Sequence, residues 1–168
     1  MATVTLKGTP FPLIGDLPTS GTAADFSFVK SDLSEGKMSD YEGKVKVLIA
    51  VPSLDTGVCQ METRKFNEEL SKRDGAVGLI LSKDLPFAMN RFCEAEGIKN
   101  VTIASDFRFG QFTKAYNTEV AEGPFGGLSA RAVFVVDANN QIQYTELVTE
   151  IADQPNYDAV MKAVDGLL

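Results

Sequence analysis

Residues 44–59 read KVKVLIAVPSLDTGVC, an apolar strand that leads into the start of a helix. The continuous, β-branched run over 44–51 is typical of a strand that is buried on both faces of a parallel sheet. The PSLDTG segment that follows suits a tight turn and a helix cap, so we expect a helix over 59–72 that begins at Cys59. A strand that opens into a helix is where α/β folds build their sites.

The rest of the chain alternates short apolar runs with amphipathic segments. The expected strands cover residues 26–30, 76–82, 100–105, 131–136 and 141–148, and the expected helices cover 85–97, 109–116 and 156–168. Residues 1–25 are expected to form a hairpin or an extended arm, and residues 31–44 a polar loop. This order indicates an α/β, thioredoxin-like fold that forms a single domain over residues 1–168. Its features would be a central mixed sheet, flanking helices, an N-terminal β-hairpin and right-handed crossovers.

Composition limits the partners that the chain can take. Its 168 residues suffice for one buried core, and they carry a formal net charge of −7. That acidity argues against nucleic acid and anionic membranes and favours a small uncharged substrate or a protein partner. The chain opens without the pattern of a signal peptide, and its apolar segments fall short of the ~18 residues that span a bilayer. Since two cysteines are too few for a disulfide scaffold, we expect a cytoplasmic protein.

The chain has no histidine. This excludes a Cys–His protease, a Ser–His–Asp hydrolase and any imidazole metal site, and we expect neither a metal nor another cofactor. A reactive Cys59 would therefore have to be activated by the helix dipole, a hydroxyl and an arginine.

Cys59, Thr56 and Pro52 each allow a structural and a functional reading. Cys59 could be a small buried apolar residue or a functional thiolate, and its position favours the thiolate. Thr56 is expected to cap the helix by accepting a hydrogen bond from the N–H of residue 58 or 59, with its hydroxyl directed towards the sulfur. Pro52 could end the strand or keep water away from the sulfur.

Cys93 lies 34 positions after Cys59, on the predicted helix over 85–97. Taken alone, its place on the edge of the apolar stripe favours a packed thiol. A disulfide with Cys59 needs Cβ atoms about 4 Å apart, so one helix would have to unwind for the two to pair.

Arg131 opens a core strand directly after the glycine-rich loop GPFGGLSA. It could be a solvated strand end or a cation directed at the site, and a thiolate in a chain without histidine needs some fixed positive charge. Position alone does not choose Arg131 over Lys65, Arg64 or Lys83.

PSLDTGVC contains the pattern P-x-x-x-T-x-x-C of peroxiredoxins, with Pro52, Thr56 and Cys59 in register. Three further stretches point to a more specific group of proteins within that family: DTGVCQMETRKFNEEL, SKDLPFAMNRFCEAEGIKNV and GLSARAVFVVD. With these at matching distances, the chain resembles the bacterial thiol peroxidases, which are atypical two-cysteine peroxiredoxins. The resemblance covers essentially the whole chain.

The resemblance implies a role for each candidate residue. Cys59 would be the peroxidatic thiolate that reduces hydrogen peroxide and alkyl hydroperoxides and becomes a sulfenic acid. Thr56 would orient the peroxide, Arg131 would stabilise the thiolate and the developing charge, and Pro52 would shield the sulfur. Cys93 would be the resolving cysteine, which condenses with the sulfenate in the same chain. The family relies on thioredoxin as the reductant, and its members are usually homodimers.

Three other functions compete with this expectation. A thiol–disulfide oxidoreductase normally uses C-x-x-C, and Glu62 stands where its second cysteine would be. A non-catalytic redox sensor that passes its disulfide to a partner would use the same two cysteines, so it stays open at this point. An inert domain with two buried thiols would not react with peroxide.

The apolar loop over 124–128 hints at the edge of an apolar pocket.

Overall fold

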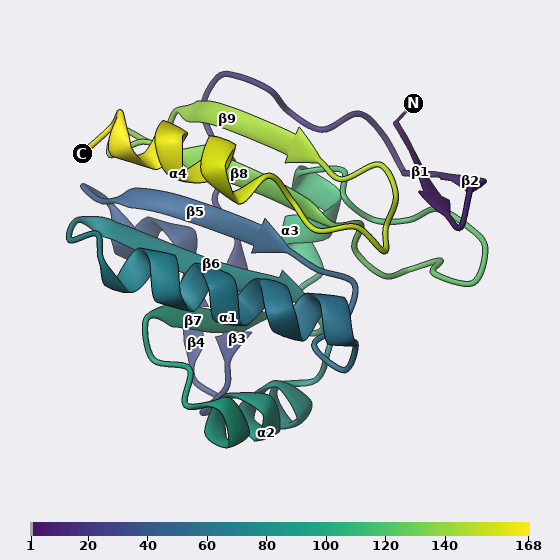
Figure 1. Ribbon diagram of the computed structural model, residues 1–168, viewed down its shortest axis with the longest axis horizontal. Helices are drawn as coiled ribbons and strands as arrows, with labels where there is room; N and C mark the ends of the chain where they lie inside the picture. Colours follow the sequence, from purple (N-terminus) through teal and green to yellow (C-terminus); the bar gives the residue numbers. More distant parts are fainter. Residues whose placement is uncertain (1) are drawn as a thin grey trace.

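The computed structural model describes residues 2–168, which fold around a seven-stranded mixed sheet (Figure 1). In spatial order its strands are β4 (Glu35–Lys37), β3 (Ser27–Lys30), β7 (Val101–Ser105), β6 (Ala76–Ser82), β5 (Val45–Ala50), β8 (Ala132–Val136) and β9 (Ile142–Leu147). The three central strands β7, β6 and β5 are parallel to one another, while the outer strands pair in antiparallel fashion. This is the expected thioredoxin-like arrangement.

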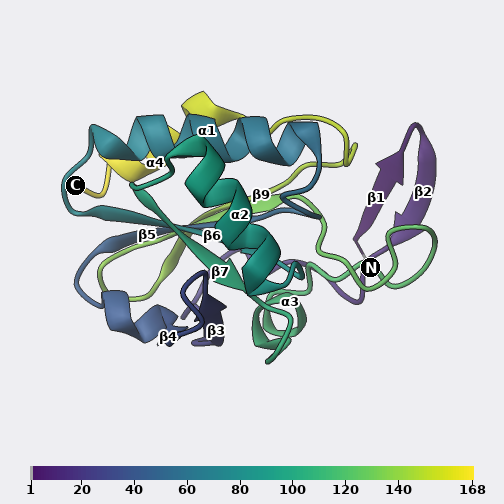
Figure 2. The same ribbon diagram turned by 90° about the horizontal axis from the view of Figure 1, so that it is seen from below.

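Helices cover both faces of the sheet (Figure 2). The helices α1 (Gly57–Ser71), α2 (Pro86–Glu96) and α4 (Tyr157–Asp165) pack on one face, and α3 (Gln111–Ala115) and the 3₁₀ helix η1 (Met38–Tyr41) lie on the other. The central strand β5 shows why residues 47–50 are all apolar. Val47 and Ile49 point into the core under α1, while Leu48 and Ala50 point into the core that contains α3.

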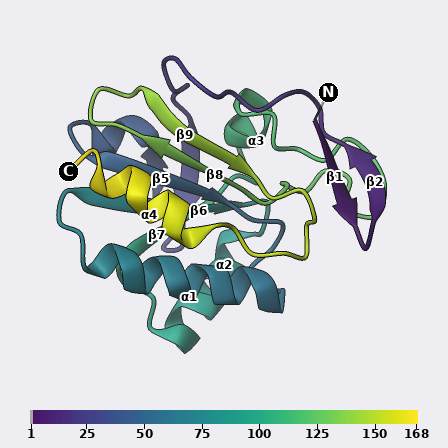
Figure 3. The same ribbon diagram turned by 45° about the horizontal axis from the view of Figure 1, so that its top comes forward.

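The N-terminal segment forms the expected hairpin, made of β1 (Thr3–Leu6) and β2 (Thr9–Pro12). The hairpin stands apart from the main sheet, beside the end of the molecule where α1 begins (Figures 1 and 3). Thr5 fixes it there, because its N–H donates to Thr149 O and its carbonyl accepts from the N–H of Ile151. The hairpin is therefore joined to the loop that follows β9.

Residues 31–44 are not the simple polar loop that we expected, because they contain β4 and η1. Gly36 allows β4 to pair with β3, since a Cβ at this position would lie 2.8 Å from the ring of Phe28. Met38 then enters the core with 1% exposure. Among residues 2–168, no helix is long and apolar enough to cross a membrane.

Candidate active site

Cys59 lies in the first turn of α1, just beyond the carboxyl end of β5. Its side chain is fully buried, and it belongs to the apolar cluster between α1 and the sheet. Burial alone is what an inert packed thiol would show. The contacts of its sulfur therefore matter for the choice between the two interpretations.

The Arg131 guanidinium donates to the Cys59 sulfur, with Nη1 3.3 Å from Sγ. The same Nη1 donates to Oε2 of Glu62 at 2.6 Å, while Nε and Nη2 both donate to the carbonyl of Ile151, at 3.1 and 2.9 Å. Burial lowers the pKa of Arg131, but the neighbouring Glu62 and Cys59 raise it by more. A charged and almost fully buried guanidinium is thus fixed against the thiol.

The structure also explains why the other candidate cations do not serve this site. Arg64 pairs with Glu96 on α2, Lys65 pairs with Glu69 further along α1, and Lys83 approaches Asp106. The choice of Arg131 follows from strand pairing. Ala50 of β5 lies opposite Ala132 of β8, so the residue before Ala132 is brought beside the end of β5.

Glu62 is a site residue to which sequence reasoning assigned no role. It is fully buried, its Oε2 binds Arg131, and no donor among the described residues reaches its Oε1. Burial raises the pKa of Glu62 to about 7, and the opposing effect of Arg131 is smaller. A sequence signal did exist. Glu62 lies between Cys59 and Phe66 on the buried face of α1, and a carboxylate on such a face needs a cation.

Thr56 occupies the N-cap position of α1, but its side chain does not cap the helix. Its hydroxyl instead donates to the carbonyl of Ser53 at 3.0 Å, so the expected bond from the N–H of residue 58 or 59 is wrong. Because the hydroxyl proton is used in this bond, the lone pairs of Oγ1 are left to accept from another group. The side chain is exposed, which makes it accessible to a small substrate.

Pro52, Thr56 and Arg131 line one small cleft with a volume of about 160 Å³. The cleft is predominantly apolar, and four separate segments build it: the N-terminal hairpin, the start of α1, the glycine-rich loop and the loop after β9. Its other lining residues are Leu6, Gly57, Val58, Phe125, Ile151 and Ala152. The cleft therefore offers one cation and one hydroxyl within apolar walls, next to Cys59.

Neither cysteine is among the residues that line this cleft, and Cys93 lies on a different helix, α2. It is half-buried and packs against the same apolar cluster that contains Cys59, and both thiols are free. Burial, with a smaller contribution from Glu94, raises the pKa of Cys93 to about 11. Cys93 is therefore a protonated thiol at neutral pH.

Comparisons with known proteins identify the family of the chain. The Redoxin family model matches residues 18–161. A thiol peroxidase of Leptospira interrogans is 51% identical over the full length of both chains. A thiol peroxidase of Aquifex aeolicus is 44% identical over 99% of this chain and 98% of its own.

Solved structures extend the similarity to three dimensions. A peroxiredoxin-like protein from Aquifex aeolicus superposes with a TM-score of 0.94 at 44% identity, over 99% of this chain and 97% of the other. The thiol peroxidase from Chromobacterium violaceum shares the fold, with a TM-score of 0.87 at 22% identity over 98% and 95% of the two chains. The chain therefore belongs to the Redoxin family, and it is a thiol-dependent peroxidase of the peroxiredoxin type.

Proposed function

We propose that Cys59 is the thiol that attacks the peroxide. The observation that carries this assignment is the 3.3 Å contact between the Cys59 sulfur and the Arg131 guanidinium. In the first step the thiolate sulfur attacks the terminal peroxide oxygen and the O–O bond breaks. The leaving oxygen takes the electron pair and a proton and departs as water or an alcohol, while Cys59 becomes a sulfenic acid.

The cleft residues would hold the peroxide for this attack. Thr56 Oγ1 can accept the peroxide O–H, because its own proton is already donated to Ser53. Arg131 stabilises the thiolate and then the charge that develops on the leaving oxygen. Pro52 is buried at the wall of the cleft and limits the access of water to the sulfur.

Cys93 would resolve the sulfenic acid in the same chain. Its thiol attacks the Cys59 sulfur, the S–O bond breaks, and the hydroxyl leaves as water with the thiol proton. The raised pKa of Cys93 fits this order of events, because that thiol does not compete with Cys59 for peroxide. Both cysteines belong to helices, so we expect local unwinding before the disulfide forms.

Substrate range, reductant and assembly complete the proposal. The apolar walls of the cleft suit alkyl hydroperoxides as well as hydrogen peroxide. Thioredoxin would supply the two electrons that reduce the disulfide, in the cytoplasm. We further propose that residues 1–168 form a single domain and that the enzyme works as a homodimer.

Thiol counting before and after one equivalent of peroxide tests the mechanism. The wild type should fall from two free thiols to none, and Cys59→Ser should keep its single thiol. Cys93→Ser should lose its one thiol to a sulfenate or an intermolecular disulfide. If the wild type kept both thiols, the assignment of Cys59 and Cys93 would be wrong.

Turnover separates this enzyme from the redox sensor. With thioredoxin, thioredoxin reductase and excess peroxide, a peroxidase consumes many equivalents of reductant per chain. A sensor would be oxidised once and stop until its specific partner was added.

A further inference from the structure

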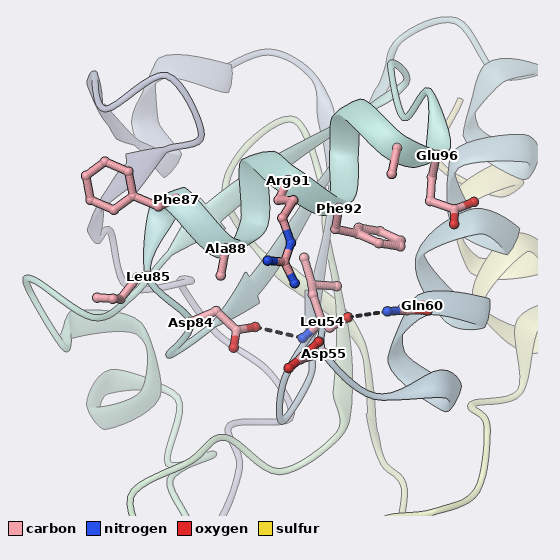
Figure 4. A pocket seen from close by; sticks show the side chains of 11 residues that line it. Leu54, Asp55, Gln60, Asp84, Leu85, Phe87, Ala88, Arg91, Phe92 and Glu96 are labelled. Carbon is pink, nitrogen blue, oxygen red and sulfur yellow. Dashed lines mark hydrogen bonds between the residues drawn. The ribbon is translucent and has the colours of Figure 1, made fainter.

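Asp84 lies between β6 and α2, two residues before the helix that bears Cys93, and it reaches across to the loop that precedes Cys59 (Figure 4). Its Oδ1 accepts from the Ser53 hydroxyl at 2.7 Å. Its Oδ2 accepts from the Leu54 N–H and from the Ser82 hydroxyl, also at 2.7 Å each. Three hydrogen bonds thus end on one carboxylate, and two of them come from the loop that leads into α1.

The backbone of Leu54 is held from both sides. Asp84 accepts from its N–H, while the Gln60 side chain donates to its carbonyl at 3.0 Å, and both bonds are drawn in Figure 4. Gln60 is the neighbour of Cys59 on α1. One residue of the loop therefore links the helix of Cys59 to the entry of the helix of Cys93.

The same loop residues carry the Thr56 hydroxyl. Ser53, whose hydroxyl donates to Asp84, accepts the Thr56 hydroxyl at its carbonyl. Asp84 is itself fixed to the sheet, because its carbonyl accepts from the Ser105 hydroxyl at 2.5 Å. The position of Thr56 at the cleft thus depends on an anchor at the far side of the loop.

A cavity of about 570 Å³ lies between this loop and α2, lined by Leu54, Asp55, Asp84 and Phe92 among others. Because this space is open, hydrogen bonds rather than close packing join the loop to the entry of α2 at this point. The Leu54 side chain is buried in the core under α1, so the loop keeps an apolar anchor when those bonds are removed.

We propose that Asp84 is a positioning residue that latches the peroxide-reactive conformation. With its bonds made, Thr56 and Cys59 stay in place for the attack on peroxide. With its bonds broken, the loop and the first turn of α1 are free to move, and the Cys59 sulfenic acid can reach Cys93. This inference rests on the roles of Cys59 and Cys93 proposed above.

A latch of this kind makes the two chemical steps respond in opposite directions. Removing it slows sulfenic acid formation, because the folded site is less populated, and it speeds disulfide formation. Removing the latch also protects the enzyme from excess oxidant, because the sulfenic acid then persists for a shorter time. A second peroxide converts the sulfenic acid to sulfinic acid only while the sulfenic acid persists.

Asp84→Ala is the direct test. The chain has no tryptophan to report the steps by fluorescence, so each step is followed by rapid acid quench, thiol alkylation and intact-mass measurement. We expect the rate constant of disulfide formation to rise about tenfold. The peroxide concentration that inactivates half of the enzyme should rise by about the same factor, and sulfenic acid formation should slow. Asp84→Asn should stay close to wild type, because the amide oxygen can accept from Leu54 and Ser82 while the amide nitrogen donates to Ser53.

Gln60→Ala releases Leu54 from the other side and should shift both steps in the same directions by about threefold. It also keeps the proposal testable if Asp84→Ala does not fold. Asn67→Ala is the matched control. The Asn67 side chain joins α1 to the backbone of Lys99 and Asn100 but does not touch Leu54, so its loss should leave both rates unchanged.

The latch is wrong if Asp84→Ala and Gln60→Ala change both steps in the same direction, or if Asn67→Ala shifts them equally. These outcomes leave the roles of the cysteines intact. Failure of those roles would show itself separately, as free thiols that survive peroxide in the wild type.

Discussion

Nη1 of Arg131 lies 2.6 Å from Oε2 of Glu62 and donates from the same nitrogen to the sulfur of Cys59. A buried carboxylate and the reactive thiol thus share one donor. The charge of Glu62 therefore bears directly on how strongly the guanidinium is drawn towards the thiol. The consequences can be measured.

Glu62→Gln should change how stability depends on pH. Burial raises the pKa of Glu62 from 4.5 to about 7, so between these values the folded state binds more protons than the unfolded state. The stability that this group contributes is complete below pH 4.5 and is lost as pH rises through 7, a difference of about 3 kcal/mol. Urea unfolding at about pH 5 and about pH 8 should show this decline in the wild type and not in Glu62→Gln.

Glu69→Gln is the control for this measurement, since Glu69 lies on the same helix. A hydrogen bond from Arg73 lowers the pKa of Glu69, so its contribution has the opposite sign. The decline between pH 5 and 8 should therefore persist in Glu69→Gln. A wild-type stability that did not fall over this range would contradict the prediction.

Arg131→Met should damage both stability and rate, and a second substitution should separate the two. Loss of the cation leaves the Glu62 carboxyl buried without its hydrogen-bond donor, which costs about 1–3 kcal/mol in the free energy of unfolding. Burial then holds this carboxyl in its neutral form at pH 7. The rate of sulfenic acid formation should fall by about 10²–10³. In the double variant Arg131→Met with Glu62→Gln, stability should recover while the rate stays low. Arg64→Met is the control: it removes a cation that is remote from the cleft, and it should retain the rate. Recovery of the rate in the double variant would remove Arg131 from the chemistry.

Thr56→Val should slow the reaction with peroxide without the stability loss of a removed helix cap. The side chain makes no capping bond, so the penalty of about 1 kcal/mol that is typical of an N-cap should not appear. Thr56→Ser keeps the hydroxyl and should retain the rate. Single-turnover kinetics together with urea unfolding of the three proteins decide the point, and equal rates for the valine and serine variants would contradict it.

Phe125→Ala should affect bulky hydroperoxides more than hydrogen peroxide. Phe125 forms part of the apolar wall of the cleft, and its loss removes contact area that only an alkyl group can use. We expect KM for cumene hydroperoxide to rise about five- to tenfold and kcat/KM for hydrogen peroxide to stay within a factor of two. Phe87→Ala, an exposed phenylalanine on α2, is the control and should change neither.

The main strands and helices could be predicted from the sequence because each is marked by its own apolar period. β4 could not, because Glu35, Gly36 and Lys37 form a strand only by pairing with β3. The site was predictable to the same extent. Cys59 and Thr56 can be identified from their local spacing. Arg131 is brought beside them by strand pairing, which no local pattern encodes. The resemblance to a family supplied that step, and it did not supply Glu62.

The buried trio of Arg131, Glu62 and Cys59 has a final consequence for the energetics of turnover. The attack proposed above starts from one cation, Arg131, beside two anions: the Cys59 thiolate and, above pH 7, the Glu62 carboxylate. Oxidation to the neutral sulfenic acid leaves one of each, because the proton that the leaving oxygen takes up neutralises the surplus negative charge before water or alcohol departs. The loss of one buried negative charge favours the oxidative half of the cycle, whereas each reduction must restore an anion beside Glu62.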